Sequence, residues 1–371
     1  MKIGFDQEQT QFREVVSRFL RERSPIEVVR ALMETEQGFD AELWKQTCGE
    51  VGLAGIHIPE EYGGAGFGPV ELGIVLEEMG RSLYCGPFFS SSVMAGFAIL
   101  EYATPVYKEE LLPGIAEGTQ LATLVLDNLD SPAWVGQQFT VVADGDSVHL
   151  TGRAEIVVDA HLVDVFIVPV YANAKFSLYK VSSREPGVTV AQRPVMDLTR
   201  KLSSVSLKNA SATLISGASD VDIHRIWDFL SSMLAHEMVG GAQTLLESTV
   251  EFTKTRVQFG RQIGSFQSLK HICADLLHDI ELAKAATYHS ARCLAGDAEN
   301  PSAANMAKAM ASDAYMDAAK AAIQLRGGIG FTWEEDTHLW FKRAKSSEVF
   351  LGTSNWHRQK LVERKLEEMN A

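Results

Sequence analysis

Two changes in hydrophobic periodicity constrain the fold of this chain more than any other feature of its sequence. After Asp6, which is placed to cap a helix, apolar residues recur at steps of three and four: Phe12, Val15, Val16, Phe19 and Leu20. Further helices are predicted over residues 43–51 and 69–82. The helical period is then lost, returns near Asp220 and continues to Leu366.

Between the two helical parts, the chain consists of short alternating runs, which predict an antiparallel β-domain. Turn residues such as Pro186-Gly187 separate the runs, which cover residues 121–126, 139–143, 148–151, 163–170, 176–181, 188–191 and 205–207. The sequence therefore predicts an α+β, mainly α, fold. We expect an N-terminal helical domain, a middle β-domain and a C-terminal helical bundle that also serves oligomerisation, at residues 1–118, 119–219 and 220–371.

Composition excludes several classes of partner. The chain has 371 residues, 46% of them apolar, and a formal net charge of −14 with a pI near 5.2. An acidic chain without a clustered basic surface is not expected to bind nucleic acid, although an anionic nucleotide could still bind locally. No run of 18 apolar residues occurs, so no membrane segment is expected.

The four cysteines show no Cys-x-x-Cys spacing and lie in apolar segments that we expect to be helical: Cys48, Cys85, Cys273 and Cys293. This pattern indicates neither a zinc site nor a disulfide framework, and we predict buried free thiols and no metal. The first residues contain no signal-peptide core. We therefore expect a cytoplasmic protein.

A glycine-rich stretch at residues 57–68 could be taken for a phosphate-binding loop. No strand is predicted before it, and no Lys-Ser or Lys-Thr pair follows its glycines. We interpret it as a connector between helices.

Three segments in the last third of the chain carry a family resemblance. Residues 256–267 read Arg-Val-Gln-Phe-Gly-Arg-Gln-Ile-Gly-Ser-Phe-Gln, and residues 324–331 read Gln-Leu-Arg-Gly-Gly-Ile-Gly-Phe. Residues 348–354 read Glu-Val-Phe-Leu-Gly-Thr-Ser. All three are similar to signatures of the acyl-CoA dehydrogenases. The resemblance implies that family's fold over essentially the whole chain, with a barrel-like antiparallel β-domain in the middle and a C-terminal four-helix bundle.

The resemblance also implies FAD as cofactor, and the first two segments have suitable chemistry. An arginine such as Arg256 can make a bidentate contact with a pyrophosphate, and Gln267 and Gln324 provide neutral donors and acceptors. Glycines let backbone N–H groups approach an anion. The cofactor-binding residues carried over from the family's motifs are Arg256, Phe259, Gln267, Gln324, Gly327, Gly328, Gly330 and Thr353. By itself, the glycine run would be read as the end of a helix.

The residues that would perform chemistry in the chain's own site are missing. Family members usually carry a glutamate before Gly-Thr-Ser, which removes the α-proton of the acyl thioester, and here this residue is Leu351. The alternative base position is Leu230, and the arginine of the family's Asp-x-x-Arg substrate segment, which begins at Asp228, is replaced by Ser231. Because leucine cannot accept a proton, we predict no catalytic residue at either base position.

Both loops that bind the flavin ring in the family also differ here. The first loop corresponds to residues 124–132, which lack the expected hydroxyls and turn glycine. In the second, Ile156 stands where the stacking tryptophan is expected, and Val158 replaces a hydroxyl residue that would bond the N5 region. A polar edge of the ring buried without partners would cost about 1–3 kcal/mol per group. We therefore expect weak flavin binding in this chain's own pocket.

Other residues are less suited to act as the base. Glu348 would share a face with Leu351 if that segment is helical, and Glu237 lies two turns beyond Leu230. We interpret both as charged surface residues, and His236 and His271 as core or surface histidines. The run Trp-Glu-Glu-Asp at residues 333–336 is interpreted as a solvated loop with an anchoring aromatic residue.

The chain keeps the cofactor segments around Arg256 and Gln324 but lacks the usual base and the ring-binding residues. This difference leads to one main hypothesis. In the family, the segments around Arg256 and Gln324 reach the ADP half of FAD in the neighbouring subunit, whereas the ring is bound within the β-domain. The chain thus resembles the non-catalytic subunit of the heterotetrameric α2β2 dehydrogenases that act on steroid-CoA thioesters. The implied partners are a catalytic acyl-CoA dehydrogenase paralogue that shares the FAD, the acyl-CoA substrate and electron-transfer flavoprotein.

Two alternatives remain open at this point. The chain could be a scaffold or acyl-CoA-binding protein without redox chemistry, or an active homotetramer with a relocated base. The sequence specifies neither the acyl group nor the exact stoichiometry, nor whether the chain's own pocket binds any ligand.

Overall fold

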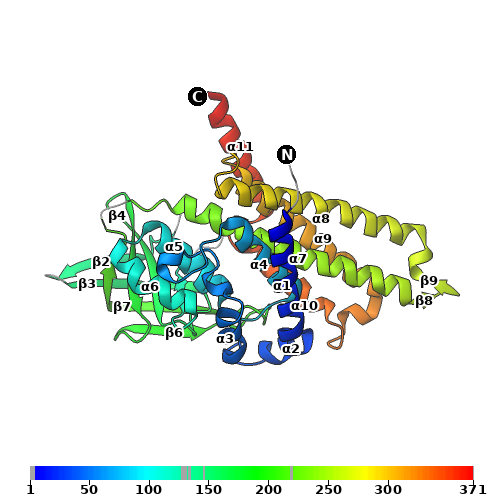
Figure 1. Cartoon of the computed structure of the whole chain (residues 1–371), viewed down its shortest axis with the longest axis horizontal. Helices are drawn as coiled ribbons and strands as arrows, with labels where there is room; N and C mark the ends of the chain where they lie inside the picture. The colour runs from blue at the N-terminus through cyan, green and yellow to red at the C-terminus, as the bar shows by residue number, and fades with distance from the viewer. Residues whose placement is uncertain (1–4, 127–131, 133–134, 145–146, 218–219, 371) are drawn as a thin grey trace. The chain divides into compact units, whose positions relative to one another are not determined.

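A computed structural model describes residues 5–126, 132, 135–144, 147–217 and 220–370 of the chain. Its first helices are α1 (Gln7–Arg23), α2 (Ile26–Met33), α3 (Ala41–Gly49), α4 (Pro69–Ser82), α5 (Gly96–Tyr102) and α6 (Pro105–Glu117), with a π-helix, η3, at Phe88–Ala95 (Figure 1). The predicted cap of the first helix is confirmed: the Asp6 carboxylate accepts a hydrogen bond from Gln9 N at 2.8 Å, and the Gln9 side chain accepts one from Asp6 N.

The middle of the chain forms a seven-stranded sheet. Its strands are β1 (Ala122–Leu124), β2 (Phe139–Asp144), β3 (Ser147–Val158), β4 (Val165–Ala172), β5 (Lys175–Ser182), β6 (Val188–Gln192) and β7 (Leu202–Leu214). The order is β1-β4-β5-β7-β3-β2, with β6 also paired to β7. Each predicted run overlaps one of these strands. The pairs are antiparallel as predicted, except that β1 runs parallel to β4.

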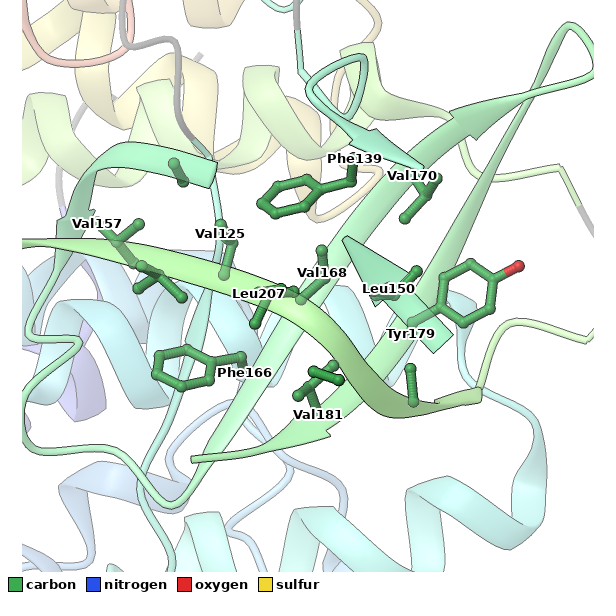
Figure 2. Packing of buried hydrophobic residues seen from close by; sticks show 14 of the residues in the cluster. Val125, Phe139, Leu150, Val157, Phe166, Val168, Val170, Tyr179, Val181 and Leu207 are labelled. Atoms are coloured by element: carbon green, nitrogen blue, oxygen red, sulfur yellow. The ribbon is translucent and has the colours of Figure 1, made fainter. Parts of the chain in front are cut away.

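The strands of this sheet enclose a buried apolar core, and β1 and β4 are buried along nearly their whole length. Figure 2 shows Phe166, Val168 and Val181 packed near Leu207 and Val125. Strand β3 shifts register between Leu150 and Gly152, as a β-bulge does.

The C-terminal part is helical apart from a short hairpin. It consists of α7 (Ile223–Thr255), the strands β8 (Val257–Gln258) and β9 (Arg261–Gln262), then α8 (Gln267–Leu294), α9 (Ala303–Arg326), the 3₁₀ turn η6 (Gly327–Phe331), α10 (Thr337–Val349) and α11 (Ser354–Asn370). The long helices α8 and α9 pack against each other, and α10 and α11 both contact α9 (Figure 1).

The chain divides into two compact units, which are discontinuous in sequence. We call the first the helical unit; it comprises Met1–Val29, Pro69–Tyr84 and Ser231–Ala371. The mixed unit comprises Arg30–Gly68 and Cys85–Leu230 and contains the sheet. The three sequential domains proposed above, at residues 1–118, 119–219 and 220–371, remain a prediction.

Two glycines let α4 and α7 cross closely within the helical unit. A Cβ atom on Gly80 would lie 1.9 Å from the carbonyl oxygen of Glu237, and one on Gly240 would lie 1.9 Å from that of Glu77. No side chain fits at either position. These contacts fix the part of α7 that leads to the candidate site.

Two expectations about the cysteines need correction. All four are free thiols, but Cys85 lies in the connection after α4 rather than in a helix. Cys273 and Cys293 are only half-buried, because they lie at the edge of the buried face of α8. Within the described residues, no group of histidine, cysteine or acidic side chains is arranged to hold a metal, and no helix is long and apolar enough to span a membrane.

Candidate functional site

The first predicted cofactor segment begins where α7 ends. Arg256 follows the last helical residue, and its carbonyl accepts a hydrogen bond from Ile263 N at 2.9 Å, which closes the hairpin β8–β9. The two turn residues, Phe259 and Gly260, have φ angles of 54° and 77°, as in a type I′ turn. Phe259 is 90% exposed. A large apolar side chain displayed to solvent on a left-handed backbone is unusual.

The second segment begins where α9 ends, as the alternative reading of its glycines anticipated. Gly327 caps the helix with φ 63° and ψ −139°, a conformation that favours glycine. Gly330 lies against α9, where a Cβ would be 3.0 Å from the carbonyl oxygen of Ile323. Gly328 differs from both, because its φ is not in the left-handed range and no atom lies within 4 Å of a Cβ built on it. Packing within the described chain therefore does not require glycine at this position.

The polar side chains of these segments face solvent. Arg256, Gln267 and Gln324 are all exposed. Within the described part of the chain, none of the three makes a side-chain hydrogen bond or ion pair. Their donors are therefore available to a ligand or a partner.

Thr353 has a structural role that the sequence alone did not reveal. Its hydroxyl accepts a hydrogen bond from Trp356 N at 3.3 Å, and its carbonyl accepts one from His357 N at 3.1 Å. It is therefore placed as the N-cap of α11. Its role as a cofactor-binding residue stays a prediction.

The segment around Leu351 is not helical, which corrects the idea that Glu348 could share its face. Helix α10 ends at Val349, and Leu351 adopts a left-handed φ of 60° while its side chain is fully buried. Glu348 instead pairs with Lys345. The strained backbone therefore places an apolar side chain where the family's base is expected.

Two buried side chains fix this conformation. The ammonium group of Lys308, on α9, donates to the carbonyl oxygens of Ser347 and Gly352 at 3.0 and 3.1 Å. It also contacts the carbonyl of Glu348 and the hydroxyl of Ser312. A cation thus satisfies carbonyls left free at the end of α10.

The second of these side chains is His357, which binds the carbonyl of Leu351 itself. Its Nε2 lies 2.8 Å from that oxygen, and its Nδ1 lies 3.0 Å from Oδ1 of the Asn305 side chain. Burial, and to a smaller extent the Lys308 cation, lowers the pKa of His357 to about 3. The ring is therefore neutral near pH 7 and carries a single proton, which on Nε2 would be donated to the carbonyl of Leu351.

The remaining candidate bases are ion-paired, buried or, for His271, exposed on the surface of α8. Glu237 is not a surface residue as predicted, because it is buried and its carboxylate lies 3.0 Å from the guanidinium of buried Arg343. His236 is buried, and desolvation lowers its pKa to about 3, whereas His271 is exposed on α8. Both histidines thus match their interpretation as core or surface residues.

In the mixed unit, the positions that should contact a flavin ring are apolar or differently engaged. Val158 is buried and Ile156 is 37% exposed. Next to them, Asp159 has a φ of 51° and accepts a hydrogen bond from Ser90 at 2.7 Å. Much of the first predicted ring loop, at residues 127–131, lies outside the described residues. Leu230 and Ser231 are both buried in α7.

Sequence reasoning missed the role of Arg326, which lies inside the Gln-x-x-Gly-Gly motif. Its guanidinium is buried and forms an ion pair with Glu335 at 2.8 Å. This pair engages one residue of the loop at 333–336, in which Trp333 and Glu334 are exposed as expected of a solvated loop. The available signal was an arginine on a helix otherwise rich in alanine, followed nine residues later by a glutamate.

Comparison with known proteins gives the same assignment over both ends of the chain. Residues 6–119 match the family described as the N-terminal domain of acyl-CoA dehydrogenase, and residues 231–366 match the corresponding C-terminal domain. Acyl-CoA dehydrogenase IpdE2 of Mycolicibacterium smegmatis is 33% identical over 346 residues, which cover 93% of this chain and 95% of that protein.

Solved structures of similar fold include a steroid ACAD and a complex of two proteins. The Tcur3481-Tcur3483 steroid ACAD, solved as a variant, has a TM-score of 0.90 with 26% identity, over 98% of this chain and 99% of that one. The ChsE4-ChsE5 complex from Mycobacterium tuberculosis has a TM-score of 0.89 with 24% identity, over 99% of both chains, and this likeness concerns the fold alone.

Proposed function

Since this chain belongs to the acyl-CoA dehydrogenase family, we propose that it is the non-catalytic subunit of a heteromeric enzyme of that family. It would complete the FAD site of a catalytic paralogue and contribute no base of its own. The observation that carries the proposal is a contrast within the helical unit: Arg256, Gln267 and Gln324 are exposed and unengaged in the described chain, whereas Leu351 is apolar and buried.

The residues fit one half of the cofactor better than the other. Family members bind FAD. Arg256 can bind a pyrophosphate oxygen pair, and Gly328 leaves its backbone open to close approach. By contrast, Val158 offers no hydrogen bond to a ring edge. We therefore assign Arg256, Gln267, Gln324 and the glycine segment to the FAD of the partner subunit.

The chemistry would take place in the partner's site. There, a glutamate would remove the α-proton of the acyl-CoA, and bound FAD would accept the hydride from the β-carbon. The part of this chain is to bind and orient the ADP half through charge-assisted hydrogen bonds. Electron-transfer flavoprotein is the proposed acceptor of the electrons.

The proposed substrate class is a bulky CoA thioester, including steroid side-chain thioesters. It is supported by the similarity to a steroid ACAD. A relocated base in this chain is a weaker account, since Glu237 and Glu348 are both engaged in ion pairs.

The decisive experiment measures flavin stoichiometry. The chain would be purified alone and together with the acyl-CoA dehydrogenase encoded beside it, and the flavin absorbance per chain would be measured. We expect little FAD on the isolated chain and stable FAD in the complex. One tightly bound FAD per isolated chain would falsify the proposal.

Two substitutions sharpen this test. Arg256→Ala should weaken FAD retention in the complex by roughly 10- to 100-fold, the loss expected for a charged hydrogen bond of about 1.5–3 kcal/mol. Lys254→Ala, which removes an exposed cation two residues earlier, should leave FAD retention unchanged. Leu351→Glu alone should not give acyl-CoA dehydrogenation by the isolated chain, and activity in that variant would contradict our account of its own pocket.

A further inference from the structure

We infer that Arg326 and Glu335 form a clamp that positions the two cofactor-contacting segments of the helical unit relative to each other. This inference rests on the function proposed above. Arg326 is the last residue of α9, directly before the glycine segment. Its side chain reaches α7 on one side and the loop after the glycines on the other, so a single guanidinium connects three stretches of chain.

The first set of contacts reaches α7. Nη1 of Arg326 donates to the hydroxyl of Thr249 at 2.9 Å, and Nη2 donates to the hydroxyl of Ser248 at 3.1 Å. The guanidinium also lies over the ring of Phe252, 5.3 Å from its centroid. Thr249 precedes Arg256 by seven residues, which is about 10 Å along a helix. The clamp therefore binds the last two turns of the helix that presents Arg256.

The second set of contacts closes the loop after the glycines. Nε of Arg326 donates to Glu335 Oε1 at 2.8 Å, and the hydroxyl of Thr337, in the first turn of α10, donates to the same oxygen at 2.7 Å. The chain between Arg326 and Glu335 is thus tied at both ends. Gly328, the glycine that packing does not explain, lies inside this closed stretch.

The residue type fits a positioning role rather than direct contact with a phosphate. The Arg326 side chain is only 5% exposed, and its guanidinium is occupied by Ser248, Thr249 and Glu335. Lysine carries the same charge but cannot reach partners on both sides with a planar fork. Arg256, by contrast, has an exposed and unengaged guanidinium within the described chain. The two arginines of the motifs therefore have different roles: Arg256 binds the cofactor, and Arg326 orients the two segments.

The helical unit provides a matched control. Arg343 and Glu237 form another buried ion pair, 3.0 Å apart, between α10 and α7. It does not involve either cofactor-contacting segment. A variant of this pair therefore reports what the loss of a buried arginine fork does to stability alone.

The test compares Arg326→Lys and Glu335→Gln with Arg343→Lys. In the full chain alone, amide hydrogen exchange should accelerate at residues 327–336 and at 250–258 for the two clamp variants, and not for Arg343→Lys. In the complex with the catalytic paralogue, FAD affinity, measured by fluorescence titration of the FAD-depleted complex, should fall about tenfold for the clamp variants. It should change less than twofold for Arg343→Lys at a comparable loss of melting temperature.

The inference is overturned if the clamp variants alter exchange and FAD affinity no more than Arg343→Lys does. Should Arg326→Lys fail to fold, Glu335→Gln decides by the same two measurements, since Glu335 is partly exposed. Arg256→Ala in the same titration separates this inference from the proposed function. If Arg256→Ala leaves FAD affinity unchanged, the proposed function fails; if only the clamp variants leave it unchanged, the clamp fails alone.

Discussion

The helical unit contains two segments that resemble signatures of the family, and they are built in opposite ways. At Leu351 the backbone is strained and is bound by Lys308 and His357, but the side chain cannot accept a proton. At Arg256 the side chain has the chemistry, but it is exposed and unengaged in the described chain. A segment that serves its own subunit can be completed by its own core. Under the proposed function, the Arg256 segment serves another subunit and must leave its polar groups open.

This difference separates stability from function in the two segments. Substitutions around Leu351 should destabilise the isolated chain, because they leave buried carbonyls without donors. Substitutions in the exposed segments should matter mainly when the partner is present. Each prediction below tests one side of that contrast.

The largest effect is expected for Lys308→Met. This change removes a buried cation that satisfies at least three carbonyl oxygens. We expect the free energy of unfolding, measured by urea denaturation, to fall by about 3 kcal/mol or more. Lys320→Met on the same helix removes an exposed lysine paired with Asp317 and should change it by less than about 0.5 kcal/mol. Equal effects of the two substitutions would contradict the contrast.

A smaller effect concerns His357 and acid. Because burial lowers the pKa of the folded-state histidine from 6.5 to about 3, the unfolded chain binds a proton that the folded chain does not. Stability should therefore be complete above about pH 6.5 and fall as pH decreases toward 3, by up to about 1.4 kcal/mol per pH unit. His357→Gln should reduce this slope by about that amount in denaturation curves measured from pH 6.5 to 5.

His236→Gln is the matched comparison for this prediction. Its pKa is also lowered to about 3 by burial, so its loss should reduce the slope in the same way. Only His357→Gln should accelerate hydrogen exchange around Leu351, because only His357 binds that carbonyl. Faster exchange there in both variants would show that the segment responds to general destabilisation.

The sequence predicted most of this arrangement, for a physical reason. Helices and strands follow from local periodicity, so each strand of the seven-stranded sheet was found and Asp6 was correctly placed as a cap, whereas the short hairpin β8–β9 was missed. The long-range partners of charged residues were not predictable in this way. Glu237 looks like a surface residue in sequence, yet it is buried beside Arg343. Glu335 is partly exposed, but its ion pair with Arg326 across a loop was likewise not predictable. The left-handed turn at Leu351 was also missed, since glycine is the residue normally expected at a positive φ.

The exposed hairpin predicts a gain of stability with a loss of function. Phe259 adopts a left-handed φ of 54° that asparagine tolerates better, and Asn-Gly is a favoured type I′ turn. We expect Phe259→Asn to stabilise the isolated chain by about 0.5 kcal/mol, after the lost contact with the ring of Phe266 is included. The same variant should bind the catalytic paralogue more weakly, as measured by calorimetry.

Phe331→Asn provides the control for this gain of stability. Phe331 is likewise exposed, at 81%, but its φ is not left-handed. It should not stabilise the isolated chain. If Phe259→Asn neither stabilises the chain nor weakens association, the strain at the hairpin has no role in the interface.

The smallest effect is predicted for Gly328→Ala, and it separates the two kinds of glycine in the segment. A Cβ at Gly328 meets no atom within 4 Å and needs no unusual φ, so alanine should leave the isolated chain unchanged or stabilise it by up to about 0.5 kcal/mol. Gly327→Ala should instead destabilise the chain by about 1 kcal/mol or more, because of its φ of 63°.

In the complex, Gly328→Ala should be harmful although it is harmless in the isolated chain. If its missing side chain allows the cofactor to approach the backbone, Gly328→Ala should weaken FAD binding several-fold although the isolated chain is intact. The measurement is the FAD titration of the complex beside urea denaturation of the chain alone. A Gly328→Ala complex with unchanged FAD affinity would mean that this open backbone faces solvent in the assembly, and the glycine segment would then contribute through Gln324 and the end of α9 alone.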